Sequence, residues 1–164
     1  MRAAKVLMLA AVLLAGTARA AHLPYDESAN APAQVREALE RAAADQHPLL
    51  IIFGANWCPD CRALDVAMAK PRNALLLAAQ FVVVKVDVGN FDRNLELTKR
   101  YGDAIAGGIP AAAIVAPGDT LLYATHAGEL ANARHMSPDG VYEFFRKAAD
   151  AATLKSAAGV APAN

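Results

Sequence analysis

Both cysteines of this 164-residue chain lie in one short motif, Trp57-Cys58-Pro59-Asp60-Cys61. The motif follows an apolar run, Leu49 to Phe53, that is typical of a buried strand, and a helix is expected to begin near Cys58. Unpaired backbone N–H groups and the positive end of the helix dipole would then favour the thiolate of Cys58, which is the reactive form. Cys61 lies one turn deeper and within reach of a disulfide bond. The spacing predicts a redox-active pair in which Cys58 attacks and Cys61 resolves.

Other uses of a Cys-x-x-Cys pair are less favoured by the residues. A zinc site needs two further ligands, and the usual paired spacing is absent among the four histidines, His22, His47, His126 and His135. Haem attachment needs a histidine directly after the second cysteine, where this chain has Arg62. A purely structural disulfide would close a very small loop and stabilise the chain little. Redox chemistry therefore remains the favoured interpretation, with no metal and no cofactor expected.

The composition fits a single folded domain. Hydrophobic residues make up 55% of the chain, more than a disordered polymer carries. Lys and Arg together number 16, as do Asp and Glu, so the formal net charge is +0. A neutral chain without a basic stripe argues against nucleic acid as a partner.

The first twenty residues are predicted to be a secretory signal peptide. Arg2 and Lys5 precede an uncharged run from Val6 to Gly16, and Ala18-Arg19-Ala20 supplies the small residues of a cleavage site. The apolar run is shorter than the about 20 residues that cross a bilayer, so an uncleaved anchor is the less favoured alternative. Cleavage after Ala20 would leave 13 basic against 16 acidic residues. Export and heavy alanine use suggest the bacterial periplasm.

The rest of the chain alternates helical and strand patterns. A lead-in segment, 21–32, is expected before a domain that spans 33–151, and a disordered tail is expected at 152–164. Helices are predicted at 33–47, 58–70, 72–80, 92–101 and from Ser137 on, and strands at 49–53, 81–87, 111–116 and 120–124. A strand–helix–strand crossover followed by a hairpin predicts an α/β fold, a mixed central sheet with helices on both faces.

Together these features resemble the thioredoxin-like family, over roughly residues 33–150. The match consists of the hydrophobic strand, Trp-Cys-x-x-Cys, the helix after it, and Gly108-Ile109-Pro110 just before the hairpin. The resemblance implies a thioredoxin fold in which Pro110 is cis and faces the cysteines, and in which Ile109 and Pro110 form a substrate-side wall for an extended chain. We expect Trp57 to add a flat apolar surface for substrate beside Cys58, with simple packing as the alternative.

The chain also departs from the family pattern around the motif. Thioredoxins usually keep a buried Asp six residues before the first cysteine, where this chain has Ile52, and a nearby Lys on the next strand, matched here to about Val83. Asp65, four residues after Cys61, is a possible proton acceptor in its place, unless it is only a solvated helix residue. Within the motif, Pro59 stiffens the turn, and the charge of Asp60 opposes a thiolate at Cys58.

The sequence therefore predicts an exported thiol–disulfide oxidoreductase, in the reducing direction. An oxidase or isomerase is the alternative within the class, and a non-catalytic module that binds peptides or a metal is the alternative outside it. Expected partners are disulfide-bearing proteins and, by resemblance, a membrane thiol–disulfide electron donor, because the periplasm is oxidising. Direction depends on the reduction potential and on the recycling partner.

Overall fold

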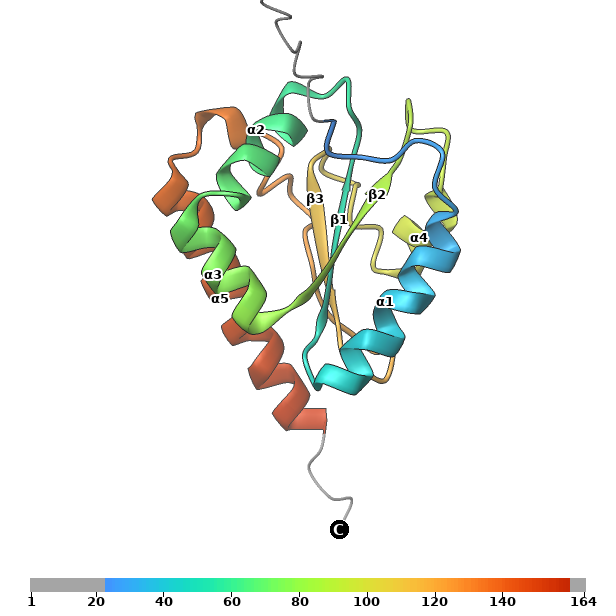
Figure 1. Ribbon diagram of the computed structural model, residues 1–164, viewed down its shortest axis with the longest axis vertical. Coiled ribbons are helices and arrows are strands. Elements are labelled where there is room, and N and C mark those ends of the chain that lie inside the picture. Colours follow the sequence, from blue (N-terminus) through green and yellow to red (C-terminus); the bar gives the residue numbers. More distant parts are fainter. Residues whose placement is uncertain (1–22, 160–164) are drawn as a thin grey trace, which may run out of the picture.

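The computed structural model describes residues 23–159, which form a four-stranded sheet between two layers of helices (Figure 1). The predicted signal peptide, residues 1–20, lies outside the described residues and stays a prediction. In chain order the elements are α1 (Ala31–Asp45), β1 (Leu49–Gly54), α2 (Pro59–Met68), α3 (Pro71–Gln80), β2 (Val82–Asp87), α4 (Leu95–Arg100), β3 (Ala111–Val115), β4 (Leu121–Ala124), a short 3-10 turn (Ala133–His135) and α5 (Pro138–Gly159).

The sheet is mixed, as predicted, with strand order β2-β1-β3-β4. β1 runs parallel to β2 and antiparallel to β3, and β3 pairs with β4 as the predicted hairpin. All six residues of β1 are buried because this central strand is covered on both faces. A strand buried in this way is a rigid base for the motif that follows its last residue, Gly54.

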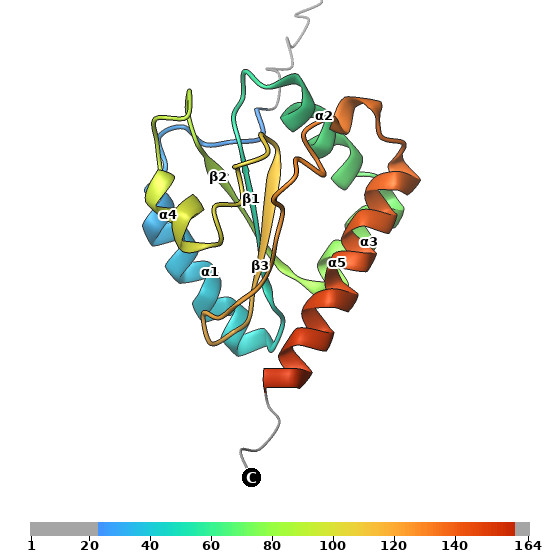
Figure 2. The same cartoon turned by 180° about the vertical axis from the view of Figure 1, so that it is seen from behind.

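Two hydrophobic clusters, one on each face of the sheet, hold the layers together. Alternate residues of β1 point to opposite faces, so Leu49, Ile51 and Phe53 join α1 in one cluster. Leu50 and Ile52 join the helices of the other face in the second. Figures 1 and 2 show these layers from both sides, with α1 and α4 on one face and α2, α3 and α5 on the other. The helix α2 contributes to both clusters, with Cys61 in the first and Leu64, Ala67 and Met68 in the second.

Two predicted boundaries are wrong. The tail expected to be disordered from Ala152 is helical up to Gly159, because an alanine-rich segment has high helix propensity and Ala152 is buried against the second cluster. The lead-in segment is part of the domain, since Tyr25 and Ala31 belong to the first cluster. Within residues 23–159, no helix has both the length and the apolar character needed to cross a membrane.

Candidate active site

Cys58 occupies the N-cap of α2, at the end of the turn that follows β1. Its backbone N–H donates to the carbonyl of Ala55 at 3.2 Å, which closes the turn. Its Sγ accepts the backbone N–H of Cys61 at 3.1 Å, in the way that a hydroxyl caps a helix. The predicted helix start is therefore confirmed to within one residue. This hydrogen bond places an unpaired helical N–H group directly on the sulfur of Cys58 and stabilises negative charge there.

Cys61 lies one turn deeper in α2 and is more enclosed. Both thiols are free, and their residues are 4% (Cys58) and 1% (Cys61) exposed. Burial, followed by the hydrogen bond with Cys58, raises the pKa of the Cys61 thiol well above its usual range. Cys61 is therefore a protonated thiol at neutral pH, in contact with the cysteine that it would have to attack.

The loop before β3 faces the motif. The Ile109–Pro110 peptide bond is cis, and both residues are buried. The thiol of Cys58 donates to the carbonyl oxygen of Ile109 at 3.7 Å, across 51 positions of sequence. The loop therefore lies next to the reactive sulfur and covers one side of it.

Trp57 lies beside Cys58 and is half exposed, at 50%. Its indole N–H donates to the carbonyl of Gly89 at 2.8 Å. Its ring meets Phe91 edge-on, with 6.1 Å between the ring centroids, and Phe91 is also exposed. The two rings form an open apolar surface next to the motif, held in place by the loop after β2.

Asp60 is buried, and its charge is compensated by a residue far along the chain. Oδ1 accepts the backbone N–H of Arg134 at 3.0 Å, and Oδ2 lies 3.7 Å from Nε of the same residue. Arg62, which follows the motif, instead donates to the carbonyl of Asn56 at 3.1 Å. Arg134 thus weakens the predicted repulsion between Asp60 and a Cys58 thiolate. Pro59 occupies the first helical position, where its missing N–H costs no helical hydrogen bond.

The match of Val83 to the usual lysine is wrong. In the β1–β2 register the residue opposite Ile52 is Lys85, so the strand keeps a lysine on the face covered by α2. Lys85 forms an ion pair with Asp65, whose side chain is 16% exposed. The predicted position is two residues too early because the register between two strands is set by their contacts, which the sequence of one strand does not show. The carboxylate of Asp65 on α2 is therefore positioned by Lys85 on β2.

Sequence reasoning missed Tyr25, an aromatic residue of the lead-in segment that packs under the cysteines. It is 4% exposed, and its hydroxyl oxygen and Sγ of Cys61 both lie against Gly54, at the end of β1. Its backbone N–H donates to Oδ1 of Asn56 at 3.0 Å, and Nδ2 of Asn56 donates back to its carbonyl at 2.8 Å. The one signal available was Gly54, because a glycine that ends a buried strand often marks a close approach by another segment.

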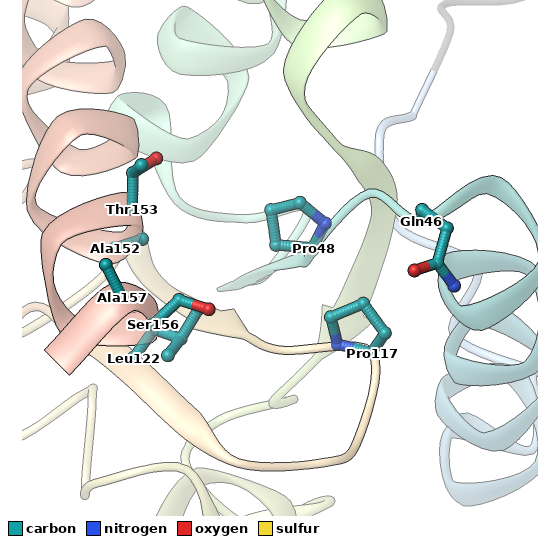
Figure 3. A pocket seen from close by; sticks show the side chains of 8 residues that line it. All are labelled: Gln46, Pro48, Pro117, Leu122, Ala152, Thr153, Ser156 and Ala157. Atoms are coloured by element: carbon teal, nitrogen blue, oxygen red, sulfur yellow. The ribbon is translucent and has the colours of Figure 1, made fainter. Parts of the chain in front are cut away.

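A hollow lies at the opposite end of the sheet from the cysteines (Figure 3). It lies between α1, the start of β1, the β3–β4 turn and the last turns of α5, and is lined by Gln46, Pro48, Pro117, Leu122, Ala152, Thr153, Ser156 and Ala157. None of the predicted site residues lines it. Within residues 23–159, no three His, Cys, Asp or Glu side chains are grouped as metal ligands would be.

Comparison with known proteins places the chain in a family. A family model described as thioredoxin-like matches residues 30–117, just over half of the chain. Among curated proteins, anterior gradient protein 2-B of Xenopus laevis is 35% identical over 65 residues. The chain spans about 40% of the length of that relative.

Solved structures extend the likeness to most of the domain. A protein from Xylella fastidiosa Temecula1, described as a disulphide isomerase, is 54% identical. The match covers 78% of this chain and 98% of the other, with a TM-score of 0.76. A thioredoxin from Thermus thermophilus, 23% identical with a TM-score of 0.53, covers 76% of this chain and 88% of its own and shares the fold. The same architecture therefore surrounds the Cys58–Cys61 pair and its facing loop.

Proposed function

Because this chain belongs to the thioredoxin-like family, we propose that it is a thiol–disulfide oxidoreductase that reduces disulfide bonds in proteins. The observation that carries the proposal is the position of Cys58, at the N-cap of α2 with its Sγ on the N–H of Cys61. A redox enzyme in general is supported by the fold together with the free pair of thiols. Protein disulfides as substrates and the reducing direction are the proposed refinements.

The reaction has two exchanges. The Cys58 thiolate attacks one sulfur of the substrate disulfide, that bond breaks, and the released substrate sulfur takes up a proton. Cys61 then loses its proton and attacks Sγ of Cys58, so that the mixed disulfide breaks and the second substrate sulfur leaves and is protonated. The substrate gains two electrons and two protons, which the Cys58–Cys61 pair loses. The exposed rings of Trp57 and Phe91 and the loop at Ile109 offer surfaces for the substrate chain.

Export to the bacterial periplasm belongs to the same proposal. A reductase there needs electrons from a thiol–disulfide donor, which we propose to be a membrane protein, because the compartment is kept oxidising. N-terminal sequencing of the protein recovered from a periplasmic extract tests the location. A chain that begins at Ala21 supports it, and a full-length chain retained in the cytoplasm contradicts it.

Disulfide isomerisation is the second candidate, and the 54% identical relative described as a disulphide isomerase favours it. Isomerisation uses the same first exchange, but a second thiol of the substrate, rather than Cys61, resolves the mixed disulfide. The raised pKa of Cys61 also favours it, because a protonated thiol resolves slowly and leaves time for rearrangement. Both candidates therefore require Cys58, and only reduction requires Cys61.

Two assays on three proteins separate these functions. Wild type, Cys58→Ser and Cys61→Ala are compared in the reduction of insulin with dithiothreitol and in the refolding of scrambled ribonuclease. A reductase loses insulin reduction in both variants, whereas an isomerase keeps ribonuclease refolding in Cys61→Ala. Cys58→Ser is expected to fall to the rate of the assay without protein, because a serine hydroxyl is not ionised at neutral pH. Equal activity of wild type and Cys58→Ser would show a binding module instead of an enzyme.

A further inference from the structure

Tyr25 is fixed relative to the motif by a clamp of two hydrogen bonds. Its backbone N–H and carbonyl both bond to the side-chain amide of Asn56, at 3.0 and 2.8 Å. Asn56 lies two residues before Cys58, within the turn that presents it. Nδ2 of Asn56 also donates to Glu27 at 2.9 Å, and Arg93 donates to the carbonyl of Glu27 at 3.1 Å. Figure 1 shows this segment, in blue, running along the end of the sheet at which α2 begins.

The clamp directs the phenol ring of Tyr25 to the inner side of Cys61. A Cβ added to Gly54 would lie 2.2 Å from the Tyr25 hydroxyl oxygen and 2.9 Å from Sγ of Cys61. The two atoms therefore border the same space above the end of β1, which puts the hydroxyl within reach of the sulfur. Only a glycine at position 54 leaves this space to the ring and the sulfur.

We propose, on the premise that the chain is the oxidoreductase described above, that Tyr25 is a further catalytic residue whose hydroxyl donates a hydrogen bond to Cys61 as this sulfur becomes the attacking thiolate. The donor is needed because Cys61 is enclosed and has lost the water that would solvate its charge. A hydrogen bond to an ionised partner is roughly twice as strong as one between neutral groups. The interaction is therefore strongest when the thiolate exists.

Tyr25 keeps its own proton throughout the step. Burial, followed by the nearby Cys61 and Cys58, raises the pKa of the Tyr25 hydroxyl well above its usual value. The Cys61 thiolate attacks Sγ of Cys58, the bond from Cys58 to the substrate breaks, and its electron pair leaves with the substrate sulfur. That sulfur takes up one proton, and Cys61 has lost one, so the number of protons is unchanged by the step.

The charged and titratable groups around this contact come from three elements. α2 contributes Cys58 at its cap and Asp65 on its inner turn, and β2 contributes Lys85, which pairs with Asp65. The lead-in segment contributes Glu27, beyond Asn56. Two hydrogen-bond donors favour the ionised form of Cys61 and so lower its pKa: the backbone N–H of Ala55, and then the Tyr25 hydroxyl, which is the side-chain donor.

The test resolves the two exchanges in a single turnover. Reduced protein is mixed with 5,5′-dithiobis(2-nitrobenzoate), which releases one coloured thiolate when Cys58 attacks and a second when Cys61 resolves. Tyr25→Phe is expected to keep the first phase within about twofold and to slow the second about tenfold or more at pH 7, with the plateau of the second phase moved to higher pH. Tyr101→Phe is the matched control, since Tyr101 is a buried tyrosine whose hydroxyl donates to Asp119 at 3.0 Å, away from the cysteines. It should leave both phases unchanged.

The outcomes separate this role from the proposed function. If wild type shows both phases and Tyr25→Phe matches it in the second, the role of Tyr25 is overturned while the oxidoreductase stands. If wild type shows no second phase, the proposed function fails first, and the role of Tyr25 with it. Should Tyr25→Phe fail to fold by circular dichroism, Asn56→Ala releases the clamp and keeps the phenol. A slowed second phase in that variant supports the role, and an unaltered one overturns it.

Discussion

The two ends of the sheet differ in what holds their side chains. At the carboxyl end of β1, polar groups from distant segments meet, since Tyr25 and Arg134 each bond to the motif region across 31 or more positions of sequence. At the other end the hollow of Figure 3 is lined by uncharged residues, and the hydrogen bonds of Gln46 and Thr153 stay within their own helices.

That difference shows why a surface hollow does not by itself locate the reactive site in this fold. Reactivity needs a sulfur whose charge is stabilised by groups fixed in place, and such groups are held most firmly when separate elements supply them. The cysteine end meets this condition through the N–H group at the cap of α2 and through the clamp at Asn56, which fixes Tyr25 beside Cys61. The hollow end offers room without any ionisable group in its lining.

The largest expected effect at the cysteine end comes from Cys61→Ala. The first phase of the reaction with 5,5′-dithiobis(2-nitrobenzoate) should remain, and the second should vanish, because no thiol is left to attack the mixed disulfide. The same variant should retain substrate proteins covalently on Cys58 in a periplasmic extract, visible as bands that disappear on reduction. The absence of any such band, with the first phase intact, would count against protein disulfides as substrates.

Most of the fold could be predicted from local patterns. The runs at Leu49–Phe53 and Val82–Asp87 form strands, as their apolar and β-branched composition predicts. Ser137-Pro138 marks the start of α5, where Ser137 Oγ accepts the N–H of Gly140 at 3.0 Å. The motif could also be placed, because its cysteines lie three positions apart and their relation is set by one turn of helix.

Long-range contacts at the site could not be predicted in this way. Tyr25 is joined to Asn56 across 31 positions, and Asp60 to Arg134 across 74, and neither pair leaves a periodic signal in the sequence. The position of Lys85 depends on strand register, which a single sequence does not encode locally. The sequence therefore locates the reactive sulfurs well and the groups that tune them poorly.

The next effect in size is a pH dependence of the second phase. In the mixed disulfide Cys58 carries no thiol, so burial is the remaining cause that raises the pKa of Cys61. A raised pKa leaves the thiolate as a small fraction at neutral pH. As long as the pH is below the pKa, that fraction increases about tenfold with each unit by which the pH is raised. The rate of the second phase should therefore rise about a hundredfold from pH 6 to pH 8. A rate that is flat over this range would show that free ionisation of Cys61 does not limit the second phase, as when a protein group accepts its proton.

Asp65→Asn is expected to slow the second phase about tenfold at pH 7, if Asp65 accepts the Cys61 proton as its position on α2 predicts. Lys85→Met is the matched control, because it removes the other half of the ion pair and keeps the carboxylate. Without Lys85 the carboxylate is still present to accept the proton, so this variant should keep the rate. A second phase unchanged in Asp65→Asn would leave the ion pair with a structural role only.

The smallest effect is expected at the other end of the sheet. Ser156→Leu adds an apolar side chain to the lining of the hollow, on an exposed position of α5. Because no group there touches the cysteines, both phases should stay within about twofold of wild type, and the free energy of unfolding should change by no more than about 0.5 kcal/mol. Stopped-flow mixing and denaturant melts measure the two quantities. A change in the first phase at unaltered stability would mean that the two ends are coupled through β1, the buried strand that joins them, and that the hollow affects the chemistry after all.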